Sequence, residues 1–170
     1  MKIMIIGYSG SGKSTLAEKL AKKYGVDVLY LDKVYWMPGW QPRPLEEKLK
    51  IVREFMDSHD GWVIDGNGGE LEYGRRVEEA DRLIFMDFNR FACLGRALRR
   101  YHKYKGSTRG SMTYGCNEKM DAKFAKWVFR DSRTRRHRQG YADIVSRYRD
   151  KAIVIKNQRQ LDRYYRSEGI

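Results

Sequence analysis

The chain has 170 residues, the size of one domain with a single hydrophobic core. Hydrophobic residues make up 41% of it and aromatic residues 13%, which excludes a disordered or fibrous protein. The longest apolar runs, Ile3 to Ile6 and Leu83 to Met86, are too short to cross a bilayer. We expect no signal peptide, because Met1-Lys2 leads directly into an expected strand. Two cysteines cannot build a disulfide framework or a four-ligand zinc site, so we expect a cytoplasmic protein with no membrane partner.

The charge of the chain is distributed unevenly. Lysine and arginine together number 35 and aspartate and glutamate 22, for a net charge of +13. Residues 1–87 hold 13 basic and 15 acidic residues, whereas residues 88–170 hold 22 basic and 7 acidic ones. This excess indicates a polyanionic partner, whether a nucleic acid, a membrane surface or a phosphorylated small molecule. Composition alone does not choose among them.

Short apolar runs alternate with helical patterns along the chain, which predicts a parallel sheet covered by helices on both faces. Strands are expected at 3–6, 26–31, 62–64, 83–86 and 152–155. Helices are expected at 13–24, 45–58, 89–104 and 158–166, where apolar residues recur at helical spacing. The sequence therefore predicts an α/β fold of three layers around a five-stranded parallel sheet, in one domain spanning 1–170.

One stretch, Lys105 to Lys119, is rich in glycine and has neither a helical nor a strand period. A loop of this length in a compact domain is usually functional or disordered. It lies between two expected arginine-rich helices, which suggests a mobile flap. With its flanks it would form a short basic lid over about 101–135.

The segment from Gly7 to Thr15 matches G-x-x-x-x-G-K-[ST], with an apolar strand before it and an amphipathic helix after it. Glycines at 7, 10 and 12 let successive N–H groups hold an anion, and the following helix adds its dipole. Lys13 would reach the β- and γ-phosphates, and the Ser14 hydroxyl would bind magnesium. The motif predicts an ATP and Mg²⁺ site, with nucleotide-binding residues Gly7, Ser9, Gly10, Ser11, Gly12, Lys13, Ser14 and Thr15.

Other residues narrow the class of P-loop protein. Asp65 follows the apolar run Trp62-Val63-Ile64, the pattern of a Walker B carboxylate that holds magnesium together with Ser14. The guanine-reading N-K-x-D tetrapeptide of GTPases is absent from the sequence. We also expect the extra helices and inserts of AAA-type machines not to fit in 170 residues. A small-molecule kinase is the class that remains.

The order of motifs GYSGSGKST, VLYLD, WVIDG and RLIFMD, followed by an arginine-rich helix and a flap, resembles the adenylate kinase and shikimate kinase group. Arg96 and Arg100 lie nine and thirteen residues after Asp87, the spacing at which adenylate kinases carry two arginines that contact adenine and phosphates. A more specific likeness is to bacterial DNA topology modulation proteins, which are adenylate-kinase-like P-loop proteins. It rests on Leu31-Asp32, Tyr35-Trp36, Pro38-Gly39-Trp40, Ile64-Asp65-Gly66-Asn67, Arg76 with Ala80-Asp81, and Gly115-Cys116-Asn117-Glu118-Lys119.

The chain departs from nucleotide kinases directly after Asp65-Gly66. Those enzymes continue with Phe-Pro-Arg, and that arginine holds the phosphate of the acceptor, whereas this chain reads Asn67-Gly68-Gly69. Arg75 or Arg76 would then replace the missing arginine, with Arg76 matching the topology modulation pattern. The resemblance therefore leaves the acceptor open.

We expect the acceptor to bind to the segment of about 33–60 and to Asp32, the residue before it. Asp32 follows the second expected strand, at the sheet edge where ligands bind, and could accept a hydroxyl proton or help organise magnesium. The rings of Tyr35, Trp36 and Trp40 either stack on a base or sugar or anchor this segment to the domain. The expected substrate-binding residues are Asp32, Tyr35, Trp36, Trp40, Asp65, Asn67 and Arg76.

Arginines supply the remaining catalytic candidates. Arg96 and Arg100 are four residues apart on one helix and should point the same way, toward phosphate oxygens that suit the guanidinium fork. Among the arginines of 130–138, we favour Arg133 and Arg136 as those that close on the nucleotide. The expected catalytic residues are Lys13, Asp32, Arg96, Arg100, Arg133 and Arg136.

Two functions remain open. The first is ATP- and Mg²⁺-dependent phosphoryl transfer to a small-molecule or nucleotide acceptor, with the basic flap closing over the nucleotide to exclude water. The second is a nucleic-acid-binding protein that affects DNA topology and uses ATP binding as a switch. The +15 charge of residues 88–170 and the likeness to topology modulation proteins support this alternative.

Overall fold

The computed structural model describes residues 1–170 and contains a five-stranded sheet in which every neighbouring pair of strands is parallel. The strands lie in the order β2–β5–β1–β6–β7, with bounds Lys2–Gly7 (β1), Asp27–Tyr30 (β2), Trp62–Asp65 (β5), Arg82–Met86 (β6) and Ala152–Ile155 (β7). The predicted sheet is therefore confirmed. Residues Ile3 to Ile6 of the central strand β1 are fully buried, as expected of a strand covered on both faces.

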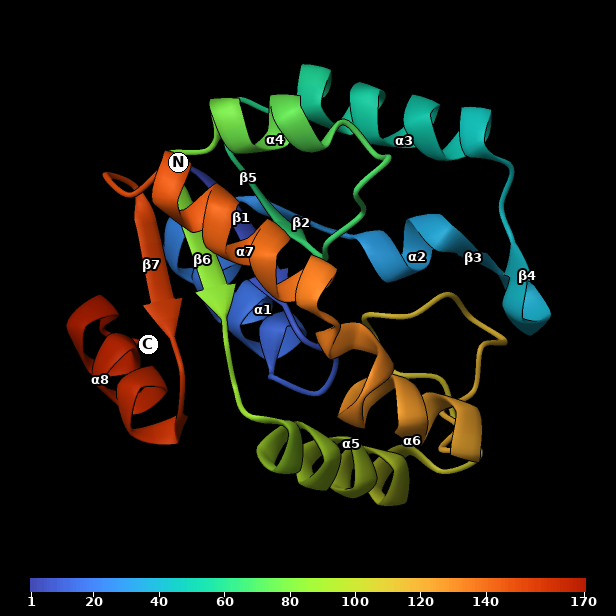
Figure 1. The fold of residues 1–170 in the computed structure, drawn as a ribbon. Helices are drawn as coiled ribbons and strands as arrows, with labels where there is room; N and C mark the ends of the chain where they lie inside the picture. Colours follow the sequence, from blue (N-terminus) through green and yellow to red (C-terminus); the bar gives the residue numbers. More distant parts are fainter.

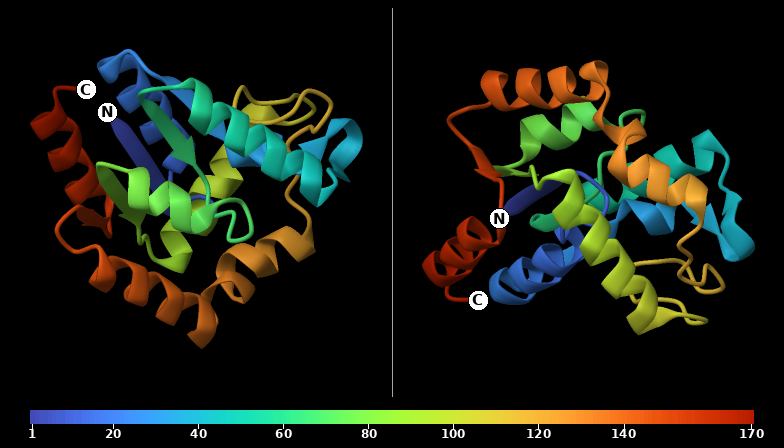
Figure 2. Two further views of the ribbon diagram at one scale, coloured as in Figure 1. Left: turned by 90° about the horizontal axis from the view of Figure 1, so that it is seen from above. Right: turned by 60° about the horizontal axis from the view of Figure 1, so that its bottom comes forward.

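Helices cover both faces of this sheet and give the fold three layers (Figures 1 and 2). The α-helices are Lys13–Tyr24 (α1), Leu31–Tyr35 (α2), Leu45–Ser58 (α3), Tyr73–Glu79 (α4), Arg90–Tyr104 (α5), Ala122–Phe129 (α6), Arg135–Arg147 (α7) and Gln158–Glu168 (α8). Figure 2 (right) shows α4 and α7 on one side of the sheet and α1 and α8 on the other. The α/β fold class is confirmed, as are the expected bounds of α1 and α3.

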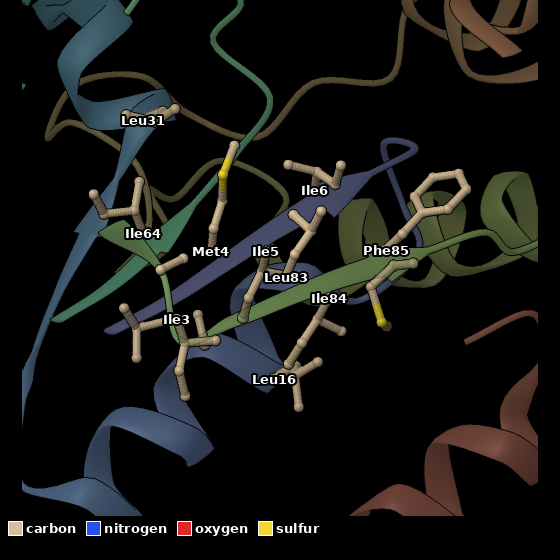
Figure 3. Packing of buried hydrophobic residues seen from close by; sticks show 14 of the residues in the cluster. Ile3, Met4, Ile5, Ile6, Leu16, Leu31, Ile64, Leu83, Ile84 and Phe85 are labelled. Atoms are coloured by element: carbon tan, nitrogen blue, oxygen red, sulfur yellow. The ribbon is translucent and has the colours of Figure 1, made fainter. Parts of the chain in front are cut away.

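The core lies between the central strands and the helices on each side. Figure 3 shows Ile3 and Ile84 directed toward Leu16 of α1, while Met4 and Ile6 lie on the opposite face of the sheet. All five side chains are fully buried. The two faces of β1 are occupied alternately because successive strand residues point to opposite sides.

Several short elements were not predicted from the sequence. The second expected strand ends early, because residues 31–35 form the one-turn helix α2, which places Asp32 in a helix rather than at a strand end. After α2 come the two-residue strands Trp36–Met37 (β3) and Gln41–Pro42 (β4), which pair antiparallel around a 3₁₀ turn at Pro38–Trp40 (η1). Helix α4 and a second 3₁₀ turn at Asp131–Arg133 (η2) are also additions.

The long loop predicted after α5 is present and spans residues 105–121, with one isolated bridge between Lys105 and Glu118. Figure 1 shows it, in yellow, running from the end of α5 toward α2 and β3. It lies at the edge of the sheet where the parallel strands end, the edge at which such sheets bind ligands. None of the helices is both long and apolar enough to cross a membrane.

Candidate active site

The phosphate-loop motif connects β1 to α1 and has the backbone conformation that its glycines allow. Gly7, Gly10 and Gly12 have φ angles of 137°, 81° and 99°. A Cβ atom on Gly10 would lie 2.3 Å from the carbonyl oxygen of Cys93 in α5. Glycine is therefore required at position 10 both by its backbone angle and by the approach of another helix.

The lysine, serine and aspartate of the two nucleotide-binding motifs meet at the end of this loop. The Ser14 hydroxyl donates a hydrogen bond to Asp65 Oδ2 at 2.6 Å, and Lys13 Nζ donates to the carbonyl oxygen of Tyr8 at 3.0 Å. Burial raises the pKa of Asp65 and lowers the pKa of Lys13, while the charge of each opposes the shift of the other. The two motifs thus form one site from β1, α1 and β5.

These residues fit a magnesium ion. Asp65 is buried, and its Oδ1 atom has no hydrogen-bond partner, although buried polar atoms normally have one. Mg²⁺ takes oxygen ligands and usually binds through one or two carboxylates, water and substrate phosphates. Ser14 Oγ and the unpartnered oxygen of Asp65 supply oxygen ligands of this kind.

Asn67 and Arg76 shape the loop after β5. Asn67 accepts a hydrogen bond from the Gly7 amide at 2.9 Å and donates to the Gly7 carbonyl oxygen at 3.2 Å. Arg76 is fully buried and donates to the carbonyl oxygens of four residues at 2.6–3.3 Å: Gly66, Asn67, Gly68 and Leu71. Burial lowers its pKa to about 10. The prediction that Arg76 binds the acceptor is wrong, because its guanidinium is bonded to the backbone and does not reach the cavity.

A cavity of about 1240 Å³ extends from the phosphate loop to the segment after β2. The predicted residues that line it are Ser9, Gly10, Gly12, Lys13, Ser14, Thr15, Asp32, Trp36, Trp40, Asp65, Asn67, Arg96 and Arg100. Those that do not are Gly7, Ser11, Tyr35, Arg76, Arg133 and Arg136. The nucleotide motifs and most of the acceptor residues are therefore brought together in one space.

The two arginines of α5 line this cavity from the same side. Arg96 contacts the carbonyl oxygen of Ser11 and the side chain of Gln158, and its guanidinium carbon lies 4.1 Å from the ring centroid of Phe88. Arg100 donates from Nε to Glu118 Oε1 at 2.6 Å. Both pKa values are lowered by burial. Both arginines line the cavity that Lys13 also lines, as expected for two residues spaced four apart on one helix.

The arginines expected to close on the nucleotide lie elsewhere. Arg133 packs behind the phosphate loop, with its guanidinium carbon 3.7 Å from the ring centroid of Tyr8 and a hydrogen bond of 2.8 Å to the Phe88 carbonyl oxygen. Arg136 is exposed on α7, and its side chain makes no hydrogen bond or ion pair. The structure therefore corrects both positions, because neither side chain reaches the cavity.

The loop of residues 105–121 is docked on the acceptor segment by polar contacts. Thr113 Oγ1 donates to the Trp36 carbonyl oxygen at 2.6 Å, and the thiol of the buried Cys116 donates to the Met37 carbonyl oxygen at 3.2 Å. Arg109 donates to Asp32 Oδ2 at 3.0 Å and lies 3.2 Å from Glu118. Arg109 and Glu118 were not among the predicted site residues, since their roles depend on this docking.

The three aromatic residues expected at the acceptor site, Tyr35, Trp36 and Trp40, lie in two different surroundings. Trp36 and Trp40 line the cavity with their ring centroids 5.5 Å apart. Tyr35 instead donates its hydroxyl to Glu70, and Lys48 lies 4.4 Å from the centroid of its ring, so it anchors α2 to the neighbouring elements. The stacking role remains open for the two tryptophans, whereas Tyr35 has the anchoring role.

This fold and site define a P-loop nucleotide-binding protein. The sequence profile of a family described as an AAA domain matches residues 3–126, so the chain belongs to that family. A length of 170 residues therefore does not separate the chain from AAA-domain proteins, contrary to the expectation from its sequence.

Several adenylate kinases are among the curated relatives, and two of them show the extent of the match. The chain is 30% identical over 112 residues to the adenylate kinase of Mesoplasma florum, covering 51% of this chain and 53% of that enzyme. It is 31% identical over 111 residues to adenylate kinase isoenzyme 1 of Bos taurus, covering 50% and 56%. The chain thus spans about half the length of these relatives. Together with the family match, they show that the chain is a P-loop protein similar in sequence to adenylate kinases over about half of its length.

Among solved structures, a deoxyadenosine kinase from M. mycoides aligns with 91% of this chain and 90% of its own, at 13% identity and a TM-score of 0.48.

Proposed function

We propose that this chain catalyses ATP- and Mg²⁺-dependent phosphoryl transfer to a small-molecule or nucleotide acceptor. The observation that carries the proposal is the hydrogen bond from Ser14 to Asp65, whose second carboxylate oxygen is buried and unpartnered. This pair lies beside Lys13, and the same cavity continues to Asp32. A site for nucleotide phosphates and an open space for a second substrate are therefore joined.

The phosphate end of this cavity has the groups that the reaction needs. The backbone N–H groups of the phosphate loop and Lys13 hold the β- and γ-phosphates. Arg96 and Arg100 add positive charge from α5, which stabilises the charge on the transferred group. Bound Mg²⁺, held through Ser14 and Asp65, neutralises negative charge on the phosphates.

The other end of the cavity receives the acceptor. The Asp32 carboxylate is 54% exposed, so an acceptor hydroxyl can reach it and pass its proton to it. Residues 105–121 cover this end, and their contacts with the acceptor segment limit the access of water to the transferred group.

Lys13→Ala tests the proposal. Because the variant lacks the cation at the transferred phosphate, acceptor-stimulated ADP release should fall by about 100-fold or more. Lys22→Ala is the matched control, since Lys22 is exposed on the same helix and makes no ion pair. It should retain wild-type turnover. The measurement is ADP release from Mg²⁺-ATP across nucleosides, nucleotides and small metabolites.

The contradicting result would be full activity of Lys13→Ala, or a wild-type protein that no acceptor stimulates. The nucleic-acid alternative predicts the second outcome, together with duplex DNA binding that persists above physiological salt. A salt-titrated DNA shift assay run beside the turnover screen separates the two functions.

A further inference from the structure

The acceptor end of the cavity has a charge balance of its own. Among its charged side chains are Asp32 on α2, Asp65 at the end of β5, Arg100 on α5, and Arg109, Glu118 and Lys119 on the loop of residues 105–121. Three of these six are carboxylates and three are cations. A charged acceptor must find its counter-ion among these groups or take one from an existing pair.

Both arginines near this end are already paired with carboxylates. Arg109 lies between Asp32 and Glu118, at 3.0 Å and 3.2 Å, and its side chain is only 12% exposed. Arg100 reaches from α5 to the same Glu118, whose side chain is 6% exposed. Glu118 thus occupies the place between two guanidinium groups that a phosphate would otherwise take. A phosphate on the acceptor would have to displace a buried carboxylate, which is costly.

Neither Arg76 nor Lys119 replaces the two paired arginines as a binding group for a phosphate on the acceptor. Arg76, which was expected to replace the missing acceptor arginine, donates its hydrogen bonds to backbone carbonyl oxygens only. Lys119 is exposed, and its ammonium lies 4.4 Å from the ring centroid of Trp40 without a carboxylate within 4.0 Å. This lysine is the one cation among these groups without a carboxylate partner, while the Asp32 carboxylate is partly exposed. A dianion is therefore disfavoured by like charge at this end.

The wall of the acceptor end is aromatic and rigidly built. The rings of Trp36 and Trp40 meet edge to face at 69° and line the cavity. Trp40 has a φ angle of 62°, a region that bulky residues rarely adopt and that persists only where the surroundings enforce it. Pairing of Trp36 with Pro42 and the hydrogen bond from the Gly39 amide to the Gly115 carbonyl oxygen hold this turn. Indole rings held in this way suit a flat ring.

We infer that the acceptor is an uncharged compound that joins a flat ring to a hydroxyl group, such as a nucleoside, and that the site discriminates against its phosphorylated form. The ring packs against Trp36 and Trp40, and the hydroxyl donates to Asp32. In the transfer, the hydroxyl oxygen bonds to the γ-phosphorus, the bond to the β-γ bridging oxygen breaks, ADP leaves, and Asp32 takes the hydroxyl proton. This inference rests on the proposed function, because it names the substrate class of the same site.

The test compares matched acceptors. Adenosine and cytidine are each compared with their 5′-monophosphates, by kcat/KM for ADP release from Mg²⁺-ATP and by the mass of the product. Each nucleoside should exceed its monophosphate by about tenfold or more, as expected for the loss of one ion pair. A monophosphate that reacts as well as its nucleoside, or better, overturns the inference and leaves the proposed function standing.

A binding measurement separates a failure of the proposed function from a failure of the inference about the acceptor. The protein is first saturated with Mg²⁺ and a non-hydrolysable ATP analogue, so that a monophosphate cannot enter the phosphate loop, and is then titrated calorimetrically with each acceptor. If nothing is phosphorylated, the proposed function fails, and this titration decides the inference alone. Tighter binding of the nucleoside supports the inference, whereas equal or tighter binding of the monophosphate, or no binding of either, overturns it.

Glu118→Gln tests the charge argument directly. The neutral side chain frees Arg100 and Arg109, so the preference for nucleoside over monophosphate should narrow by about tenfold through a gain in monophosphate activity. Glu54→Gln, an exposed substitution on α3, should leave the preference unchanged. An unchanged preference in folded Glu118→Gln overturns the charge argument. The wild-type comparison decides the inference even if the variant folds poorly.

Discussion

Gly10 shows how one residue couples the phosphate loop to a helix far along the chain. Its φ angle of 81° favours glycine, and the Cys93 carbonyl oxygen of α5 occupies the place of a Cβ atom. Cys93 is itself fully buried. A side chain at position 10 must therefore move either the phosphate loop or the start of α5, the helix that carries Arg96 and Arg100.

Gly10→Ala should lower the free energy of unfolding by about 2 kcal/mol and raise the Kd for ATP by about tenfold or more, through strain and overpacking. Urea unfolding and an ATP titration measure the two effects. Gly95→Ala is the control, because Gly95 is exposed in α5 with nothing within 4 Å of its Cβ position. It should stabilise the protein by about 0.5–1 kcal/mol. ATP binding by Gly10→Ala at the wild-type Kd would contradict the required close approach.

The residues predicted from the sequence are those whose roles are local. Lys13 and Ser14 belong to a contiguous motif, and Arg96 and Arg100 share a helix face, so spacing alone places them. The role of Arg76 depends on four carbonyl oxygens that the loop after β5 brings together, and that of Arg133 on the ring of Tyr8. A charged side chain bonded to distant backbone has the same sequence signature as one that binds a ligand.

At the scale of elements, α8 is joined to α1 and β6 through one carboxylate. Glu168 accepts hydrogen bonds from Lys23 at 2.7 Å, Tyr24 at 2.6 Å and Arg82 at 2.7 Å. Burial alone would raise the pKa of Glu168, but these hydrogen bonds outweigh it and lower the pKa to about 2. The interaction favours the folded state at neutral pH, because the ionised form is stabilised there.

Glu168→Gln should lower the free energy of unfolding at pH 7 by about 2 kcal/mol, since hydrogen bonds to a charged group are lost. The contribution of Glu168 is present above its unfolded pKa of 4.5 and is lost as the pH falls toward about 2. The difference between the two proteins should therefore be smaller at pH 3 than at pH 7. Urea unfolding at both values measures it, with Glu78→Gln, exposed and unpaired on α4, as the control. Equal differences at both values would contradict the pKa shift.

Helices α1, α3 and α8 were predicted because their apolar residues recur at helical spacing over several turns. Helices α1 and α3 have the expected bounds, and α8, which was also expected, begins after Asn157, whose side chain accepts a hydrogen bond from the Gln160 amide at 3.0 Å. Helix α4 has only seven residues and buries Arg76, so its sequence lacks an apolar stripe. Helix α2 interrupts an apolar run that continues the strand β2. Helices α2 and α4 both depend on packing against the sheet, which the spacing of apolar residues within each segment does not reveal.

At the scale of the whole molecule, the uneven charge divides between the cavity and an outer surface. Arg96, Arg100 and Arg109 belong to the positively charged part of the chain and line the cavity. Arg135 and Arg136 lie exposed on α7 without an ion pair, away from it. Phosphate binding therefore accounts for part of the excess only. A nucleic-acid partner for the rest stays a prediction, as does the likeness to topology modulation proteins.

The fate of the γ-phosphate tests the central claim most directly. Wild-type protein is incubated with Mg²⁺, γ-labelled ATP and a panel of nucleosides, nucleotides and small metabolites, and the label is traced to organic product or free phosphate. We predict that the label passes to an organic acceptor, that the transfer requires Mg²⁺, and that Lys13→Ala lowers it by about 100-fold or more. Label that appears only as free phosphate, or remains on ATP with every acceptor, would contradict phosphoryl transfer as the function of this site.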